Sequence, residues 1–196
     1  MKNVIFTVYL INKWYDREKD QLQSDRINEL RKIVRVGFKD YNKRYKTKDT
    51  NAIVEVRGLR ASAGNIVFDS IYKKMLRANA LIVDITPDES KDMRNIWLEL
   101  GMALTLAKMN EDLKVFLLCH KKDKKTKLDL KEILPSDLHG YFVTPYYYAP
   151  LNTTNKITYD DQKSFISSLH FMAQEFFRNH ELNVGEISEE ELNKLN

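Results

Sequence analysis

The chain has 196 residues and a mass of 23.1 kDa, which fits one domain and leaves little room for two catalytic domains. Apolar residues make up 43% and charged residues 31% of the sequence, enough to bury a core, so wholesale disorder is excluded. The 32 Lys and Arg residues exceed the 28 Asp and Glu residues by a dispersed net charge of +4. This excess permits anionic ligands but does not favour a nucleic-acid partner.

Targeting and redox signals in the sequence are few. The single cysteine, Cys119, lies in an apolar run, so we expect neither a disulfide nor a metal site built on cysteine. The first apolar stretch is short and leads into Trp14 and Tyr15 instead of a small-residue cleavage site, which indicates a strand and not a signal peptide. No stretch approaches the roughly 18 to 20 apolar residues of a membrane span. We therefore expect a soluble, cytoplasmic protein with no membrane partner.

Hydrophobic patterning predicts strands that alternate with helices. In chain order we expect a strand at 3–11, a helix at 21–45, a strand at 52–56, a helix at 67–79, a strand at 81–85, a helix at 92–109, strands at 113–119 and 141–147, and a helix at 160–178. Short, uniformly apolar strands are typical of parallel sheets covered on both faces. The predicted fold is α/β, a flavodoxin-like doubly wound sandwich with a mostly parallel sheet of about five strands. We expect it to span residues 1–180, with 181–196 as a polar, acidic tail.

In a doubly wound sheet, ligands bind in the crevice beyond the carboxyl ends of the strands. That rule directs attention to the residues after Thr7, Val56, Asp84 and Cys119. The basic stretch 120–127 follows the last of these strands, and we interpret it as a solvated loop in preference to an anion site.

Glu99 is the only ionisable residue between Ile96 and Ala107. A helix that is apolar nearly all round is buried nearly all round, and Glu99 shares a stripe with Ile96 and with Met102 or Ala103. Burial of an unpaired carboxylate costs several kcal/mol unless its pKa rises or hydrogen-bond partners relieve the cost. We favour Glu99 as a nucleophile or general base. The alternative is a structural glutamate paired with an arginine or with backbone amides.

Asp84 ends the third expected strand and precedes Thr86 and Pro87. A carboxylate at this place lies at the ligand-binding edge of the sheet. An Asp before a turn also organises the turn by accepting backbone hydrogen bonds. The residues leave both interpretations open.

The stretch 71–108 resembles a known superfamily. It contains ANALIVDIT at 78–86 and NIWLELGMA at 95–103. In TIR-like and nucleoside 2-deoxyribosyltransferase-like nucleotide-binding proteins, a strand ending in Asp-Leu-Thr or similar precedes an Asn-Val-Tyr-x-Glu-Leu-Gly helix. Residues 134–141 also look like the segment that leads into the last strand of these proteins. The resemblance extends from the first expected strand to the fifth, and it indicates the superfamily better than the activity.

The resemblance implies a glutamate, matched by Glu99, that attacks or stabilises the anomeric carbon of a nucleoside, nucleotide or NAD. Cleavage of an N-glycosidic bond develops oxocarbenium character on the ribose, which a carboxylate beneath C1′ stabilises. The resemblance further implies Asp84 as a second catalytic residue that orients sugar hydroxyls, while Asp69, Asp88 and Asp92 remain alternatives for the acid that assists Glu99. The implied substrate-binding residues are Thr7, Tyr9, Thr86, Asn95 and Trp97. NAD or a nucleotide would be substrate or ligand, with no separate cofactor.

Three classes of function follow. The first is an N-glycosidase or glycosyl-transfer enzyme acting on NAD or a nucleotide, for which the resemblance implies a setting in bacterial anti-phage defence. The second is a non-catalytic module that senses a signalling nucleotide in the same crevice. The third is a self-associating adaptor that uses the aromatic run 141–148, although we favour a last strand with surface tyrosines there. A homo-oligomer is compatible with each class.

Overall fold

The computed structural model describes residues 2–12, 21–44, 50–58, 67–87, 93–149, 156–157 and 159–179. Over this part of the chain, strands and helices alternate as the apolar pattern predicts. The elements are β1 (Lys2–Ile11), α1 (Gln21–Arg44), β2 (Thr50–Gly58), α2 (Val67–Met75), β3 (Ala80–Asp84), α3 (Arg94–Met109), β4 (Lys114–His120), α4 (Leu130–Ile133), the 3-10 helix η1 (Ser136–Leu138), β5 (Val143–Tyr146), β6 (Tyr148–Ala149), β7 (Lys156–Ile157) and α5 (Tyr159–Asn179).

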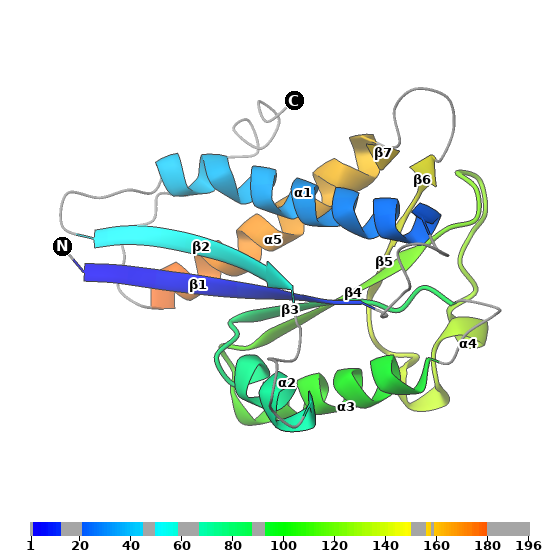
Figure 1. The fold of residues 1–196 in the computed structure, drawn as a ribbon, viewed down its shortest axis with the longest axis horizontal. Helices are drawn as coiled ribbons and strands as arrows, with labels where there is room; N and C mark the ends of the chain where they lie inside the picture. Colours follow the sequence, from blue (N-terminus) through cyan, green and yellow to red (C-terminus); the bar gives the residue numbers. More distant parts are fainter. Residues whose placement is uncertain are drawn as a thin grey trace.

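Five strands form one parallel sheet in the order β2-β1-β3-β4-β5 (Figure 1). This is the flavodoxin-like order, in which the winding direction reverses beside the first strand. The predicted doubly wound α/β fold is therefore confirmed. Because all five strands run in the same direction, their carboxyl ends meet at one border of the sheet, which we call the carboxyl edge.

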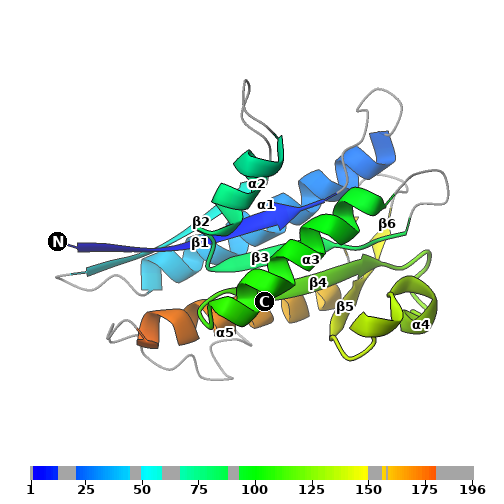
Figure 2. The ribbon, with the colours of Figure 1, turned by 90° about the horizontal axis from the view of Figure 1, so that it is seen from below.

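Helices cover both faces of the sheet (Figures 1 and 2). Successive side chains of a strand point to opposite faces, and β1 illustrates the result. Phe6, Val8 and Leu10 pack in one core with α1 and α5. Tyr9 and Ile11 pack in a second core with α2 and α3. We call these two sides the α1 face and the α3 face.

The central strand β3 is buried at all five positions, as a strand covered on both faces must be. Ala80 and Ile82 belong to the core of the α1 face, while Leu81 and Val83 belong to that of the α3 face. Replacement of a fully buried leucine by alanine typically costs about 2 to 5 kcal/mol. Packing on both faces of β3 therefore fixes the position of its last residue, Asp84.

Several predicted boundaries differ from the structure. The second helix ends at Met75 instead of residue 79, because the chain turns at residues 76–77. The predicted strand 141–147 is shorter, spanning Val143–Tyr146, and the two short helical segments α4 and η1 precede it. The two-stranded antiparallel ribbon of β6 and β7 was not expected. The predicted tail, 181–196, lies outside the described residues.

The edge strand β5 carries a proline. The carbonyl of Tyr146 accepts a hydrogen bond of 2.7 Å from the backbone N–H of Lys121, toward β4. Because alternate residues of a parallel strand direct their backbone groups to opposite sides, the backbone of Pro145 faces the free edge. Proline is suited to this position because it has no N–H to leave unpaired.

None of the helices in the part of the chain that the structure describes combines the length and the apolar character that a membrane crossing requires.

Candidate functional site

The carboxyl edge holds a buried ion pair between Asp84, the last residue of β3, and Arg26 of α1. The Nη1 atom of Arg26 lies 2.7 Å from Oδ2 of Asp84, and the two side chains are 9% and 2% exposed. Gln23, one turn earlier on α1, accepts hydrogen bonds from Nε and Nη2 of the same guanidinium at 3.2 and 2.8 Å. Burial alone would lower the pKa of Arg26, but the charge of Asp84 and hydrogen bonds from the guanidinium raise it overall. The guanidinium of Arg26 is therefore charged.

Thr86 and Tyr146 complete the environment of the Asp84 carboxylate. The Oδ1 atom accepts hydrogen bonds from the backbone N–H of Thr86, at 3.2 Å, and from its hydroxyl. The Oδ2 atom also accepts one from the hydroxyl of Tyr146 at 3.2 Å, and Arg26 donates to that hydroxyl and to the Thr86 hydroxyl. Asp84 therefore organises the turn that follows β3, as one of the two interpretations predicts. Both of its carboxylate oxygens accept hydrogen bonds from protein groups.

His120, at the end of β4, lies against this cluster. Its backbone N–H donates to the Thr86 hydroxyl at 2.9 Å, and its ring is parallel to that of Tyr147, with centroids 6.4 Å apart. The ring forms a hydrogen bond with the backbone of Tyr148, whereas Nε2 is buried and has no hydrogen-bond partner among the described residues. Burial first, and then the charge of Arg26, lower the pKa of His120 to about 4.

The imidazole of His120 is expected to stay neutral over most of the range in which histidines titrate. Its ring resonances in an NMR titration should remain constant from about pH 8 to about pH 5, whereas in the urea-unfolded chain they should titrate near about 6.5. A midpoint above about 6 in the folded protein would show that a group near the ring stabilises the cation and would contradict this environment.

Glu99 lies on the second turn of α3, half-buried. Among the described residues, no group forms a hydrogen bond or an ion pair with its carboxylate. Burial alone raises the pKa of Glu99 from 4.5 to about 7. The carboxylate is therefore desolvated without compensation, the condition that the apolar composition of this helix predicts.

The structure does not bring Asp84 and Glu99 together. Asp84 points to the α1 face, where Arg26 and Tyr146 contact it. Glu99 belongs to α3, which packs on the opposite face through Ile96, Leu100, Ala103 and Leu106. Any ligand that contacts both carboxylates must therefore reach over the carboxyl edge.

The expected substrate-binding residues do not all lie at the carboxyl edge. Thr7 lies four residues before the end of β1, where its N–H and carbonyl bond to Asn79 at the amino end of β3, so the structure does not bring it to the carboxyl edge. Tyr9 is only 4% exposed and its hydroxyl interacts with the Arg57 guanidinium. Asn95 is exposed on the first turn of α3, and Trp97 is half-buried there. Of the two candidate stacking rings, Trp97 therefore has the more accessible surface.

Of the acids considered as partners of Glu99, Asp69 is exposed on α2, and Asp88 and Asp92 lie outside the described residues. Cys119 is buried, and burial raises the pKa of its thiol to about 12, so it is no nucleophile at neutral pH. In the described part of the chain, no group of three or more His, Cys, Asp or Glu side chains is arranged to hold a metal ion.

Three arginines line a cavity of about 290 Å³ at the carboxyl end of β2. Arg31 and Arg35 project from successive turns of α1, and Arg57 comes from β2 beside Gly58. One guanidinium nitrogen of Arg31 donates to the Asn12 side chain, just after β1, at 3.1 Å. Planar guanidinium groups suit phosphate oxygens, so this cavity can accept a phosphate group beside the end of β1.

The sequence interpretation missed Arg26, Tyr146 and the three arginines of this cavity. Arg26 has a detectable signal, because it lies four residues before Leu30 and seven before Ile33, on the buried stripe of α1. A charged residue on such a stripe requires a buried partner. The arginine cavity has no comparable signal, because it depends on how α1 crosses the end of β2.

Compared with known proteins, the sequence matches no protein-family model and no curated protein.

Proposed function

We propose that the protein is an N-glycosidase or glycosyl-transfer enzyme that acts on NAD or a nucleotide, with Glu99 as the catalytic carboxylate. The observation that carries this proposal is the half-buried Glu99 side chain, whose carboxylate has no partner among the described residues and whose pKa is raised to about 7. A structural glutamate would be paired, since an unpaired buried charge destabilises the fold. Perturbed, unpaired carboxylates are typical of active sites.

The chemistry suits such a group. When the bond between C1′ and the base nitrogen breaks, the base takes the bonding electrons and the ribose gains positive charge. A desolvated carboxylate beneath C1′ stabilises that charge more strongly than one in water, or forms a glycosyl ester with it. Water or an acceptor hydroxyl then adds to C1′ and loses its proton, and where the glycosyl ester has formed, its bond to Glu99 breaks and the carboxylate leaves with the bonding electrons. On this proposal Trp97 stacks on the base, Asn95 donates a hydrogen bond, and the arginine cavity receives phosphate.

Asp84 has a positioning role in this proposal. Its four hydrogen-bond contacts engage Arg26, Thr86 and Tyr146, so its oxygens have little capacity left for sugar hydroxyls. The carboxylate instead fixes the turn at Thr86 beyond β3. The same observation favours the second candidate, a nucleotide-sensing module without turnover, because Asp84 is engaged on the α1 face and does not act as a second acid beside Glu99.

Incubation with NAD and a panel of nucleosides and nucleotides distinguishes the two candidates. Base released by the wild type but not by Glu99→Gln, followed by chromatography, supports the enzyme. Binding in a calorimeter without any released base supports the sensor. Size-exclusion chromatography under the same conditions reports whether the protein is a homo-oligomer. The role in anti-phage defence is a further part of the proposal and rests on the sequence resemblance.

A further inference from the structure

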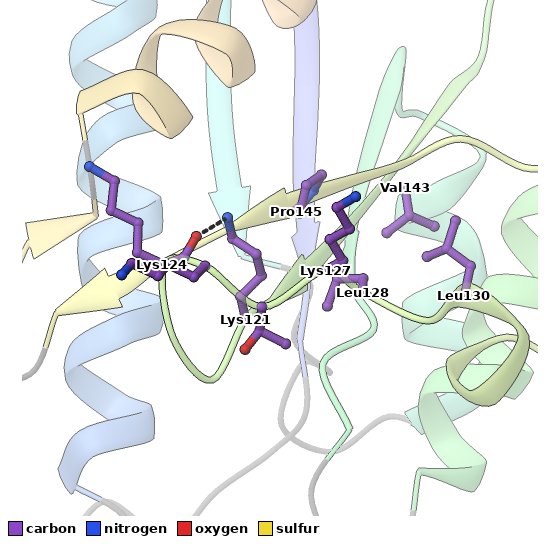
Figure 3. A pocket seen from close by; sticks show the side chains of 9 residues that line it. Lys121, Lys124, Lys127, Leu128, Leu130, Val143 and Pro145 are labelled. Carbon is purple, nitrogen blue, oxygen red and sulfur yellow. Dashed lines mark hydrogen bonds between the residues drawn. The ribbon is translucent and has the colours of Figure 1, made fainter.

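The loop that follows β4 lines, together with β5, a second cavity of about 380 Å³ that is open to solvent. Its lining combines a cationic part with an apolar part, and Figure 3 shows Lys121 and Lys124 toward one end, with Leu130 and Val143 toward the other. The lining residues are Lys121, Lys124, Lys125, Thr126, Lys127, Leu128, Leu130, Val143 and Pro145. None of these residues belongs to the groups of the carboxyl edge described above.

The excess positive charge, which the overall composition suggested was dispersed, is equalled by that of this loop alone. Residues 120–127 contain five lysines and one aspartate, which leaves four net positive charges. The whole chain has the same net charge, +4, so the remaining residues sum to neutrality. In the described part of the chain, no carboxylate lies within ion-pair distance of the four lysines that line the cavity. An anion that enters the cavity would be attracted by all four ammonium groups.

The loop is held in shape from within. The carboxylate of Asp123 accepts hydrogen bonds of 2.8 Å from the backbone N–H groups of Lys125 and Thr126, and one from the Thr126 hydroxyl. The Lys121 ammonium donates to the carbonyl of Lys124 at 3.3 Å (Figure 3). Asp123, the only acid among residues 120–127, thus orders the backbone and also interacts with the charge of Lys121. The lysines are presented by a preformed turn, which lowers the entropic cost of binding.

The size and the apolar wall restrict the ligand. A cavity of about 380 Å³ lies within the range of about 300 to 1,000 Å³ that small-molecule pockets occupy, and a lone phosphate would leave most of it empty. Leu128, Leu130, Val143 and Pro145 offer an aliphatic surface against which a flat ring can pack. A nucleic acid would instead require positive charge spread along a stripe, whereas the rest of this chain is neutral.

We propose that the cavity formed by residues 121–130 and β5 is a binding site for a ring-bearing polyphosphate, the chemistry of a nucleoside di- or triphosphate. The lysines contact the phosphates, and the ring rests on the aliphatic wall. This site differs from the one around Glu99 and does not depend on the function proposed for it.

The test is calorimetric titration of the full chain with ATP, on a Glu99→Gln background that prevents turnover. The variant Lys124→Gln/Lys127→Gln is expected to bind ATP at least about tenfold more weakly, because two charge-assisted contacts are lost. The matched control, Lys73→Gln/Lys108→Gln, removes the same charge from exposed positions on α2 and α3 and should bind as the parent does. Pyrophosphate should bind more weakly than ATP, since it lacks the ring, and adenosine more weakly still.

Any of five results would overturn the proposal. The first two are the absence of ATP binding at low salt and an equal loss of affinity in the two double variants. The third is equal affinity for pyrophosphate and ATP. The fourth is a loss of affinity in Arg35→Gln that Lys124→Gln/Lys127→Gln does not share, which would place the ligand in the arginine cavity. Tighter binding of a single-stranded oligonucleotide through the same lysines would also overturn it. Thermal unfolding establishes that each variant is folded, as expected for lysines that are exposed or half-buried and not ion-paired.

Discussion

A Glu99→Gln protein is expected to be more stable than the wild type by about 2 kcal/mol at about pH 8, and by less than about 1 kcal/mol at about pH 5. The folded-state pKa of Glu99 is raised from 4.5 to about 7 by burial. Between these values the folded state binds more protons than the unfolded state, so stability falls as the pH rises. The shift corresponds to about 3 kcal/mol, which we reduce to about 2 because the side chain is partly exposed to solvent.

Urea unfolding at the two pH values measures this difference. The control is Glu111→Gln, which removes a carboxylate from an exposed turn beyond α3 and should leave the difference near zero at both pH values. If the gap between the wild type and Glu99→Gln is the same at both pH values, Glu99 is not desolvated in the folded protein.

The same substitution is expected to lower kcat for base release at least about a hundredfold, because glutamine keeps the shape of the side chain but not its charge. In the wild type, kcat/KM should rise with pH through a midpoint near 7, where the free protein loses the Glu99 proton. Glu99→Asp retains the charge and should retain part of the activity. A variant that gains stability and loses turnover has lost a functional group. Full turnover in Glu99→Gln would remove Glu99 from the mechanism.

Replacement of Arg26 by methionine is expected to destabilise the fold by about 3 to 5 kcal/mol, a large share of the about 5 to 15 kcal/mol typical of a domain. The substitution leaves the Asp84 carboxylate, 2% exposed, without its counter-charge. It also removes the donor to the hydroxyls of Thr86 and Tyr146. The free energy of unfolding in urea at neutral pH measures the effect.

The exposed pair of Lys114 and Glu175 provides the control, because its side chains are 41% and 46% exposed and their atoms lie 3.8 Å apart. Lys114→Met should cost less than about 1 kcal/mol. The double variant Arg26→Met/Asp84→Asn should recover part of the loss, since the buried charge is then absent. An Arg26→Met protein as stable as Lys114→Met would show that water reaches Asp84 in the folded state.

The fold could be predicted because its signals are local and repeated. Five apolar runs separated by amphipathic stretches define a parallel sheet, and β3, buried at every position, is the plainest case. The ribbon of β6 and β7 could not be predicted, because each strand has only two residues, too few for a hydrophobic pattern, and Tyr148 pairs with Ile157 from a separate segment. The helix α4 has only four residues, too few for a periodic pattern.

The candidate site was only partly predictable. Glu99 stood out because one acid interrupts an apolar helix, and the structure places it half-buried with a raised pKa. Asp84 was identified at the end of its strand, but its partners Arg26 and Tyr146 are separated from it by 58 and 62 residues. The face of the sheet to which Asp84 points depends on the register of its strand. The sequence therefore did not show that Asp84 and Glu99 lie on opposite faces of the sheet.

The proline of β5 limits how copies of this chain can associate. A further strand can pair with an edge strand only if that strand offers both backbone N–H and carbonyl groups along its free side. Pro145 has no backbone N–H and interrupts this series. The lysine-rich residues 120–127 lie beside this edge, so two copies that paired there would bring like charges together. Continuous strand-to-strand polymerisation is therefore disfavoured at this border, whereas the opposite border, formed by β2, carries no proline.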